Sequence, residues 1–214
     1  MKIEGAIFDL DGTLLDSMFM WNNIGEEYLR KREIEPKTNL NEKLKAMSLY
    51  QAACYYIKEY NLKDTAEDII KDITHMIEHF YVDVVQPKPG VKNFLMCLAD
   101  KGVKMCIATA TDRHLAEVAL ARCNLLGYFG EIFTCACVGK GKDEPDIFLK
   151  CLDFLTTEKE FTFVFEDSLH AIETAKNVGF PLVGIYDSFS YDHAKIKAVA
   201  DYYIYSFEEA EKLF

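Results

Sequence analysis

The chain has 214 residues, half of them apolar and 28% charged, a composition typical of a globular protein with a full hydrophobic core. Its net charge of −11 comes without clusters of Lys and Arg, so we expect no nucleic-acid partner. No stretch is as long as a membrane span and the N-terminal MKIEGAIF lacks a signal-peptide pattern, so we expect a cytoplasmic protein with no membrane partner.

The first predicted element is a short apolar strand from Ile3 to Phe8, which runs into the segment Asp9-Leu10-Asp11-Gly12. After Thr13 the apolar spacing becomes helical and stays helical to about Val85. We expect three helical stretches there, the first capped by Asp16-Ser17, the second from Leu40 to Ile57, and the third opened by Thr65-x-x-Asp68.

The segment Pro87-Lys88-Pro89-Gly90 ends this helical region, because adjacent proline and glycine cannot continue a helix. From there to the C-terminus, helical segments alternate with apolar strands at 103–109, 132–135, 161–165 and 182–185. Repeated βα units predict an α/β fold with a doubly wound parallel sheet that includes the first strand. We therefore expect a core domain of residues 1–15 and 87–214 and an inserted all-helical domain of residues 16–86, with hinges at 14–17 and 85–90.

The seven cysteines are scattered along the chain, mostly inside apolar segments. An odd number without regular spacing does not indicate a disulfide framework. We expect buried, reduced thiols, which agrees with a reducing compartment.

The first strand delivers Asp9 to the carboxyl edge of the sheet, where open α/β sheets keep their chemistry. The glycine turn can swing Asp11 toward the same reacting centre. Two neighbouring acids suit covalent phosphoryl transfer, in which one is an ionised nucleophile and the other protonates the leaving oxygen. For this motif taken alone, a solvated turn is the alternative.

Three other segments follow predicted core strands. Thr109 and the amide of Ala110 can hold a phosphate oxygen at a helix start, or Thr109 can simply cap that helix. The loop Gly139-Lys140-Gly141-Lys142 can bring a lysine to neutralise nucleophile and phosphoryl group. Glu166 and Asp167 suit Mg²⁺, which prefers one or two carboxylates with waters and phosphate oxygens, although helix capping is the local alternative.

All four segments, in this order, resemble the haloacid dehalogenase (HAD) superfamily, in its phosphatase and β-phosphoglucomutase-like branch with a helical cap. The resemblance implies a Rossmann-like HAD core with an inserted all-helical cap domain. By matching positions, Asp9 resembles the nucleophile that forms an aspartyl-phosphate. Asp11 resembles the general acid that then becomes the base activating water.

The same resemblance implies the rest of the site. Thr109 and Ala110 resemble the phosphate clamp, and Lys142 the charge-neutralising lysine, with Lys140 as the fallback. The cofactor is Mg²⁺, held by Asp9, the backbone carbonyl of Asp11 and Asp167, while Glu166 is either a ligand or lies just behind the ligands.

The implied activity is that of a Mg²⁺-dependent phosphatase acting on a small phosphorylated metabolite, as a monomer or alternatively a dimer. Dehalogenating and phosphonate-cleaving members lack the second aspartate, so Asp11 argues against both. A hexose-phosphate mutase of this branch needs a cap arginine after a stretch like Lys45-Ala46-Met47-Ser48, and here Leu49 follows. Trp21 stands where a cap histidine falls, so both departures favour the phosphatase. A catalytically idle binding module is the third alternative.

Overall fold

The computed structural model describes residues 2–44, 47–210 and 213 of the chain. Its centre is a six-stranded, wholly parallel sheet in the order β5-β4-β1-β6-β7-β8. These strands are β1 (Gly5–Phe8), β4 (Lys104–Thr109), β5 (Ile132–Thr134), β6 (Thr162–Glu166), β7 (Leu182–Ile185) and β8 (Tyr202–Ile204). The expected doubly wound parallel sheet is confirmed, and the strand that precedes Asp9 lies in its middle.

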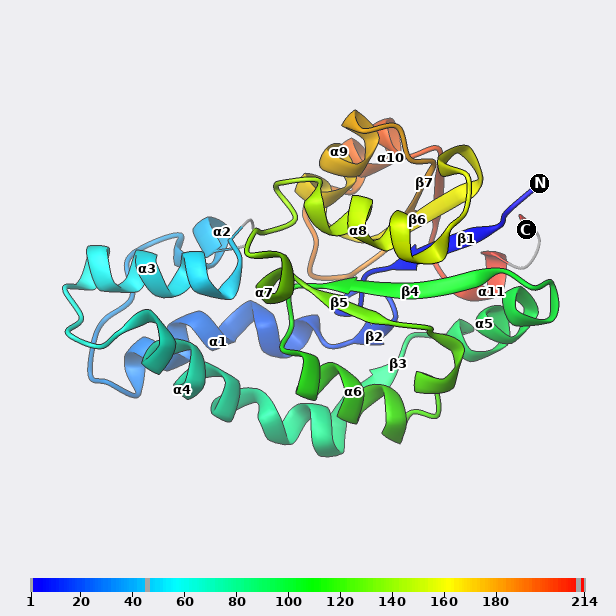
Figure 1. Cartoon of the computed structure of the whole chain (residues 1–214). Helices are drawn as coiled ribbons and strands as arrows, with labels where there is room; N and C mark the ends of the chain where they lie inside the picture. The colour runs from blue at the N-terminus through cyan, green and yellow to red at the C-terminus, as the bar shows by residue number, and fades with distance from the viewer. Residues whose placement is uncertain (1, 45–46, 211–212, 214) are drawn as a thin grey trace.

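Helices cover both faces of this sheet (Figure 1). One face carries α8 (Asp146–Leu155), α9 (Leu169–Asn177) and α10 (His193–Val199), and the other carries α5 (Val91–Asp100), α6 (Arg113–Arg122) and α11 (Phe207–Ala210). A four-residue helix, α7 (Cys135–Val138), follows β5. Each face has its own cluster of buried apolar side chains, so β1 is buried from both sides as its continuous apolar sequence predicts.

The inserted region is helical and lies beyond the carboxyl ends of the core strands (Figure 1). It contains α1 (Met18–Arg30), α2 (Leu40–Leu44), α3 (Leu49–Tyr60) and α4 (Ala66–His79), and a π-helical turn, Phe80–Val84, extends α4. The capping box of Thr65 and Asp68 opens α4 as expected. The apolar stripe Ile69, Ile73 and Ile77 is buried in the same cluster that covers one face of the sheet, so cap and core share apolar packing.

Two local expectations for the inserted region are wrong. The second helical stretch is split into α2 and α3, because Ser48 and Gln51 form a capping box that starts a new helix at Leu49. Residues 45–46 of the expected Lys45–Ser48 stretch lie outside the described residues. The side chain of Ser17 does not cap α1; its hydroxyl hydrogen-bonds elsewhere, as described below.

The two passages of chain between core and inserted helices lie side by side. They pair as a short antiparallel ribbon of β2 (Leu15–Asp16) and β3 (Gln86–Pro87). The Lys88 amide also donates a hydrogen bond of 2.9 Å to the Leu14 carbonyl. The helical spacing read from the sequence misses this ribbon, because only the antiparallel partner Pro87, 72 residues away, makes Leu15 a strand residue.

The order of the strands fixes where a ligand can bind. From β1 the chain first builds β4 and β5 on one side and then returns to build β6, β7 and β8 on the other. At such a switch point the loops after neighbouring strands part in opposite directions and leave a crevice at the carboxyl ends. The crevice opens directly at Asp9.

All seven cysteines are free. The expectation of burial holds for Cys106, Cys135 and Cys151, but Cys54 and Cys137 are exposed. No helix in the described part of the chain is long and apolar enough to cross a lipid bilayer.

Candidate active site

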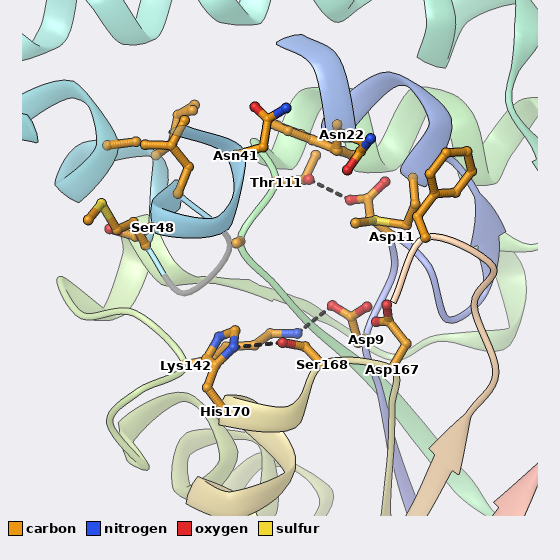
Figure 2. A pocket seen from close by; sticks show the side chains of 18 of the residues that line it. Asp9, Asp11, Asn22, Asn41, Ser48, Thr111, Lys142, Asp167, Ser168 and His170 are labelled. Carbon is orange, nitrogen blue, oxygen red and sulfur yellow. Dashed lines mark hydrogen bonds and ion pairs between the residues drawn. The ribbon is translucent and has the colours of Figure 1, made fainter. Parts of the chain in front are cut away.

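Asp9 lies at the floor of a cavity of about 640 Å³ that separates the sheet from the inserted helices. The Asp9 amide donates to the Phe165 carbonyl of β6 at 3.0 Å, which extends the ladder between these strands by one residue and fixes the backbone of Asp9. Asp9 is 7% exposed, and its side chain faces the cavity (Figure 2). The sheet therefore presents one carboxylate to a ligand from a central strand that is paired on both sides.

Lys142 reaches this carboxylate from the loop between α7 and α8. Its ammonium hydrogen-bonds to Asp9 Oδ1 and donates to Glu166 Oε2 at 2.8 Å. Lys140, the alternative lysine, lies outside the cavity and pairs with Asp146 at 3.0 Å. The left-handed Gly139, at φ +74°, ends α7 and turns the chain into this loop. Of the two lysines in the loop, only Lys142 is brought to Asp9.

Three buried carboxylates lie together at the floor of the cavity, and the ammonium of Lys142 contacts two of them, Asp9 and Glu166. Oxygens of Asp9, Glu166 and Asp167 all lie within 4.8 Å of one another. Burial and the carboxylate of Glu166 raise the pKa of Asp9, and burial with both neighbouring carboxylates raises the pKa of Asp167 well above its usual value. Burial tends to lower the pKa of Lys142, but the negative charges of Asp9 and Glu166 have the larger combined effect and raise it overall. The lysine therefore stays protonated. The cluster has an excess of negative charge.

A divalent cation fits this cluster. The donor set is carboxylate oxygen, which Mg²⁺ prefers, and two positive charges would balance three carboxylates and one ammonium. Within the cluster, both oxygens of Glu166 already accept hydrogen bonds, from Lys142 and from the amides of Asp167 and Ser168 at 3.2 and 3.1 Å. Asp9 and Asp167 are therefore better placed to hold a cation, with Glu166 orienting Lys142 behind them.

The carboxylate of Asp11 lies outside the acidic cluster, on the cap side of the cavity (Figure 2). Three hydroxyls surround it: Ser17 and Tyr81 donate to Oδ1 at 2.6 and 2.7 Å, and Thr111 donates to Oδ2 at 2.6 Å. Burial raises its pKa, while the hydrogen bonds from the hydroxyls oppose that rise. None of these three hydroxyls is expected at Asp11 from the sequence: Ser17 is expected only as a helix cap, and Thr111 only follows the motif residue Ala110.

Thr109 and Ala110 occupy the end of β4 and the first position after it. The Thr109 hydroxyl oxygen accepts the amide of Thr111 at 3.0 Å, which leaves its proton free for an anionic oxygen in the cavity. Thr109 is buried and Ala110 is exposed at the cavity wall. Both predicted phosphate-binding positions therefore face the same cavity as Asp9.

His170 also lines the cavity, beside Lys142 (Figure 2). The ring Nδ1 and the Ser168 hydroxyl are 2.6 Å apart. Burial and the positive charge of Lys142 lower the pKa of His170, so the ring is neutral near pH 7. Its position three residues beyond Asp167 on a predicted helix favours a solvated or capping histidine, and its place at the cavity wall becomes apparent only once the start of α9 is positioned.

Three comparisons relate the chain to known proteins. A phosphorylated carbohydrates phosphatase of Thermotoga maritima is 28% identical over 202 residues, with 92% of each chain covered. Fructose-1-phosphate phosphatase YqaB of Escherichia coli is 27% identical, with 86% of this chain and 97% of that protein covered. The solved structure of CbbY from Rhodobacter sphaeroides in complex with phosphate has the same fold, at a TM-score of 0.84 and 21% identity over 97% of this chain and 96% of that one.

The family model for haloacid dehalogenase-like hydrolases matches residues 6–185. The matched range starts inside β1 and extends to the end of β7, so it includes Asp9, Asp11, Lys142, Glu166 and Asp167. The chain belongs to the haloacid dehalogenase-like hydrolase family.

Proposed function

We propose that this protein is a phosphatase that hydrolyses the phosphomonoester of a small metabolite through an aspartyl-phosphate on Asp9. The observation that carries the proposal is the contact between Asp9 and Lys142 at the floor of the cavity. A lysine that pairs with a nucleophilic carboxylate offsets the repulsion between that carboxylate and an incoming phosphate dianion. The phosphatase names of two relatives support the same reaction.

In the first step, an oxygen of Asp9 forms a bond to phosphorus while the bond from phosphorus to the ester oxygen breaks. Asp11 in its acid form gives its proton to that leaving oxygen, so that a neutral alcohol departs. In the second step, Asp11 as a carboxylate takes a proton from water, whose oxygen attacks phosphorus and releases inorganic phosphate from Asp9. Thr109 and the Ala110 amide hold the non-bridging phosphoryl oxygens throughout.

Asp9, Asp167 and the backbone carbonyl of Asp11 would hold Mg²⁺, with Glu166 fixing Lys142 beside them. When bound, the cation neutralises charge on the phosphoryl oxygens. In this proposal the core domain comprises residues 1–15 and 87–214, the cap domain comprises residues 16–86, and the β2–β3 ribbon is where they join.

The cap side of the cavity supports a substrate with neutral polar groups. Lys142 is the sole lysine or arginine among the described residues that line the cavity, while Asn22, Asn41 and Ser48 line its cap side (Figure 2). Burying a second phosphate dianion there without a fixed cation would cost several kcal/mol. This favours a phosphorylated carbohydrate or polyol with one phosphate, and it favours hydrolysis over a mutase that must bind a bisphosphate.

The test is release of inorganic phosphate from 4-nitrophenyl phosphate and a panel of sugar and polyol monophosphates. We expect EDTA to stop the reaction and Mg²⁺ to restore it, and Asp9→Asn to lower turnover by at least a thousandfold, or about 4 kcal/mol in the barrier. Asp9→Asn is nearly isosteric, so circular dichroism should be unchanged. Residual activity within tenfold of wild type would refute Asp9 as the nucleophile. Isomerisation of β-glucose 1-phosphate faster than phosphate release would favour the mutase.

A further inference from the structure

The three hydroxyls on Asp11 come from different parts of the chain. Ser17 precedes the first inserted helix, Tyr81 belongs to the π-helical turn after α4, and Thr111 follows β4 of the core. The phenol of Tyr81 is completely buried. The carboxylate that protonates the leaving group in the proposed reaction is therefore held by groups from both sides of the cavity.

Tyr81 has a further partner that decides the direction of its hydrogen bond. The indole Nε1 of Trp21, on α1, donates to the Tyr81 hydroxyl oxygen at 2.8 Å. Indole N–H is a donor only, so the oxygen of Tyr81 accepts this bond and its single proton must go to another acceptor. Asp11 Oδ1 lies 2.7 Å away and the Thr111 hydroxyl 3.3 Å away, so the proton points to Asp11.

The backbone around Tyr81 is anchored to the core. Arg122 on α6 donates through Nε to the Tyr81 carbonyl at 3.3 Å, and its Nη2 donates to the Val85 carbonyl. The phenol therefore stands at a fixed position relative to the end of β4 and to Asp11. A side chain held at both its backbone and its hydroxyl can fix the orientation of the carboxyl group that it contacts.

The two oxygens of Asp11 differ in their partners. Oδ1 accepts hydrogen bonds from two hydroxyls, and Oδ2 accepts one. A proton on Oδ2 disturbs fewer hydrogen bonds than a proton on Oδ1, because only the Thr111 hydroxyl must then turn away. The pairing of Oδ1 therefore directs the transferable proton to Oδ2.

From these contacts we propose that Tyr81, held by the hydrogen bond from the Trp21 indole, is a positioning residue for the acid step at Asp11. The proposal rests on the proposed phosphatase reaction. Tyr81 does not touch the phosphoryl group: it fixes the plane of the Asp11 carboxyl and keeps the proton on Oδ2. Removing the Tyr81 hydroxyl should therefore lower kcat/KM more for substrates whose leaving group must be protonated before it departs.

The experiment compares kcat/KM for 4-nitrophenyl phosphate and phenyl phosphate, which have similar size but different leaving groups. Nitrophenolate leaves readily as an anion, whereas phenolate needs the proton more. We expect Tyr81→Phe to lower kcat/KM about tenfold for phenyl phosphate and less than threefold for 4-nitrophenyl phosphate. Trp21→Phe should also lower kcat/KM more for phenyl phosphate than for 4-nitrophenyl phosphate. The double variant should lose no more kcat/KM on phenyl phosphate than Tyr81→Phe alone, because Trp21 acts through Tyr81.

Tyr28→Phe is the matched control. Tyr28 is also buried in the inserted helices, and its hydroxyl has no hydrogen-bond partner in the described part of the chain. Its removal should leave the ratio of the two kcat/KM values unchanged. An equal loss on both substrates with Tyr81→Phe, or a ratio that moves as much with Tyr28→Phe, would overturn the proposal.

A second measurement does not depend on turnover. In a double-mutant cycle of urea unfolding, Tyr81→Phe and Asp11→Ala should be coupled by about tenfold in the unfolding equilibrium constant, as expected for a hydrogen bond to a charged group, because each variant removes one partner of that bond. Additive effects would overturn the inference. If wild type hydrolyses no phosphate ester and the coupling is present, the proposed function fails while the contact between Tyr81 and Asp11 stands.

Discussion

Replacing Asp167 by asparagine should stabilise the metal-free protein while removing its response to Mg²⁺. The oxygens of Asp9, Glu166 and Asp167 lie within 4.8 Å of one another, and all three side chains are buried. Two ionised carboxylates at 4.8 Å repel by about 3.5 kcal/mol at an effective dielectric constant of 20. Asp167 has two such neighbours, while the ammonium of Lys142 hydrogen-bonds to Asp9 and Glu166 and the charge of Lys88 offsets part of the repulsion at Asp167. We therefore expect its charge to be the most costly of the three.

Part of this repulsion is relieved by protonation, since burial and the neighbouring carboxylates raise the pKa of Asp167. We therefore expect Asp167→Asn to raise the free energy of unfolding in EDTA at pH 7 by about 2 kcal/mol, or roughly 4–8 °C in Tm. Asparagine keeps the acceptor for the Thr13 hydroxyl, which lies 3.3 Å from Asp167 Oδ1. The gain is therefore attributable to the charge.

The dependence on pH follows from the direction of the pKa shift. A raised pKa means that the folded protein binds the proton more tightly than the unfolded chain does. Wild-type stability should therefore fall as pH rises above the unfolded pKa of about 4, while the variant should show a weaker fall. The difference in free energy of unfolding between wild type and Asp167→Asn should vanish near pH 4 and increase toward pH 7.

Thermal unfolding in EDTA and in Mg²⁺ is the assay. Mg²⁺ at about one hundred times its Kd should stabilise wild type by about 2.7 kcal/mol and leave Asp167→Asn unchanged, so the order of the two Tm values should reverse. If the variant is less stable than wild type in EDTA, or if Mg²⁺ stabilises both equally, the account of the acidic cluster is wrong.

Three further substitutions test other parts of the structure. Lys142→Met should lower the free energy of unfolding by about 3–5 kcal/mol in urea titration, because it leaves two buried carboxylates without their ammonium; unchanged stability would contradict the pairing. Gly12→Ala should abolish the Mg²⁺-dependent rise in Tm, since Gly12 has φ +81° and an added Cβ would lie 2.4 Å from Asp167 Oδ2; a preserved rise would contradict that crowding. Thr65→Ala should lower stability by about 1 kcal/mol through loss of the α4 capping box without changing kcat/KM; a loss of activity would mean that α4 does more than pack.

The alternation of apolar strands and helical segments after residue 87 was enough to predict the parallel sheet and its helical faces. Burial on both faces of β1 follows from its uninterrupted apolar run, and the αβ alternation follows from short, locally encoded elements. The positions of Asp9 and Thr109 at strand ends follow from the same pattern. These predictions succeed because neighbours in sequence decide them.

Other features depend on contacts between distant residues. The split between α2 and α3 had a local signal in Ser48-x-x-Gln51 that the sequence analysis did not use. The β2–β3 ribbon has no such signal, because Leu15 becomes a strand residue only through its pairing with Pro87. The family resemblance favoured Lys142 over Lys140, and the contacts of Lys142 with Asp9 and Glu166, against the pairing of Lys140 with Asp146, come from the fold.

Asp9 and Asp11 follow the same strand, yet their side chains have different partners. From the sequence alone, Asp9 and Asp11 are expected to follow the same strand, because the chain order and the turn at Gly12 are local properties. The contacts of Asp9 with Lys142, and of Asp11 with the hydroxyls of Ser17, Tyr81 and Thr111, exist only in the folded chain. Tyr81 is 70 residues from Asp11 and Thr111 is 100 residues away, and nothing in local propensity encodes which hydroxyl will meet which carboxylate. That choice is made by the packing of the inserted helices against the core, which brings these side chains together only when the whole chain is folded.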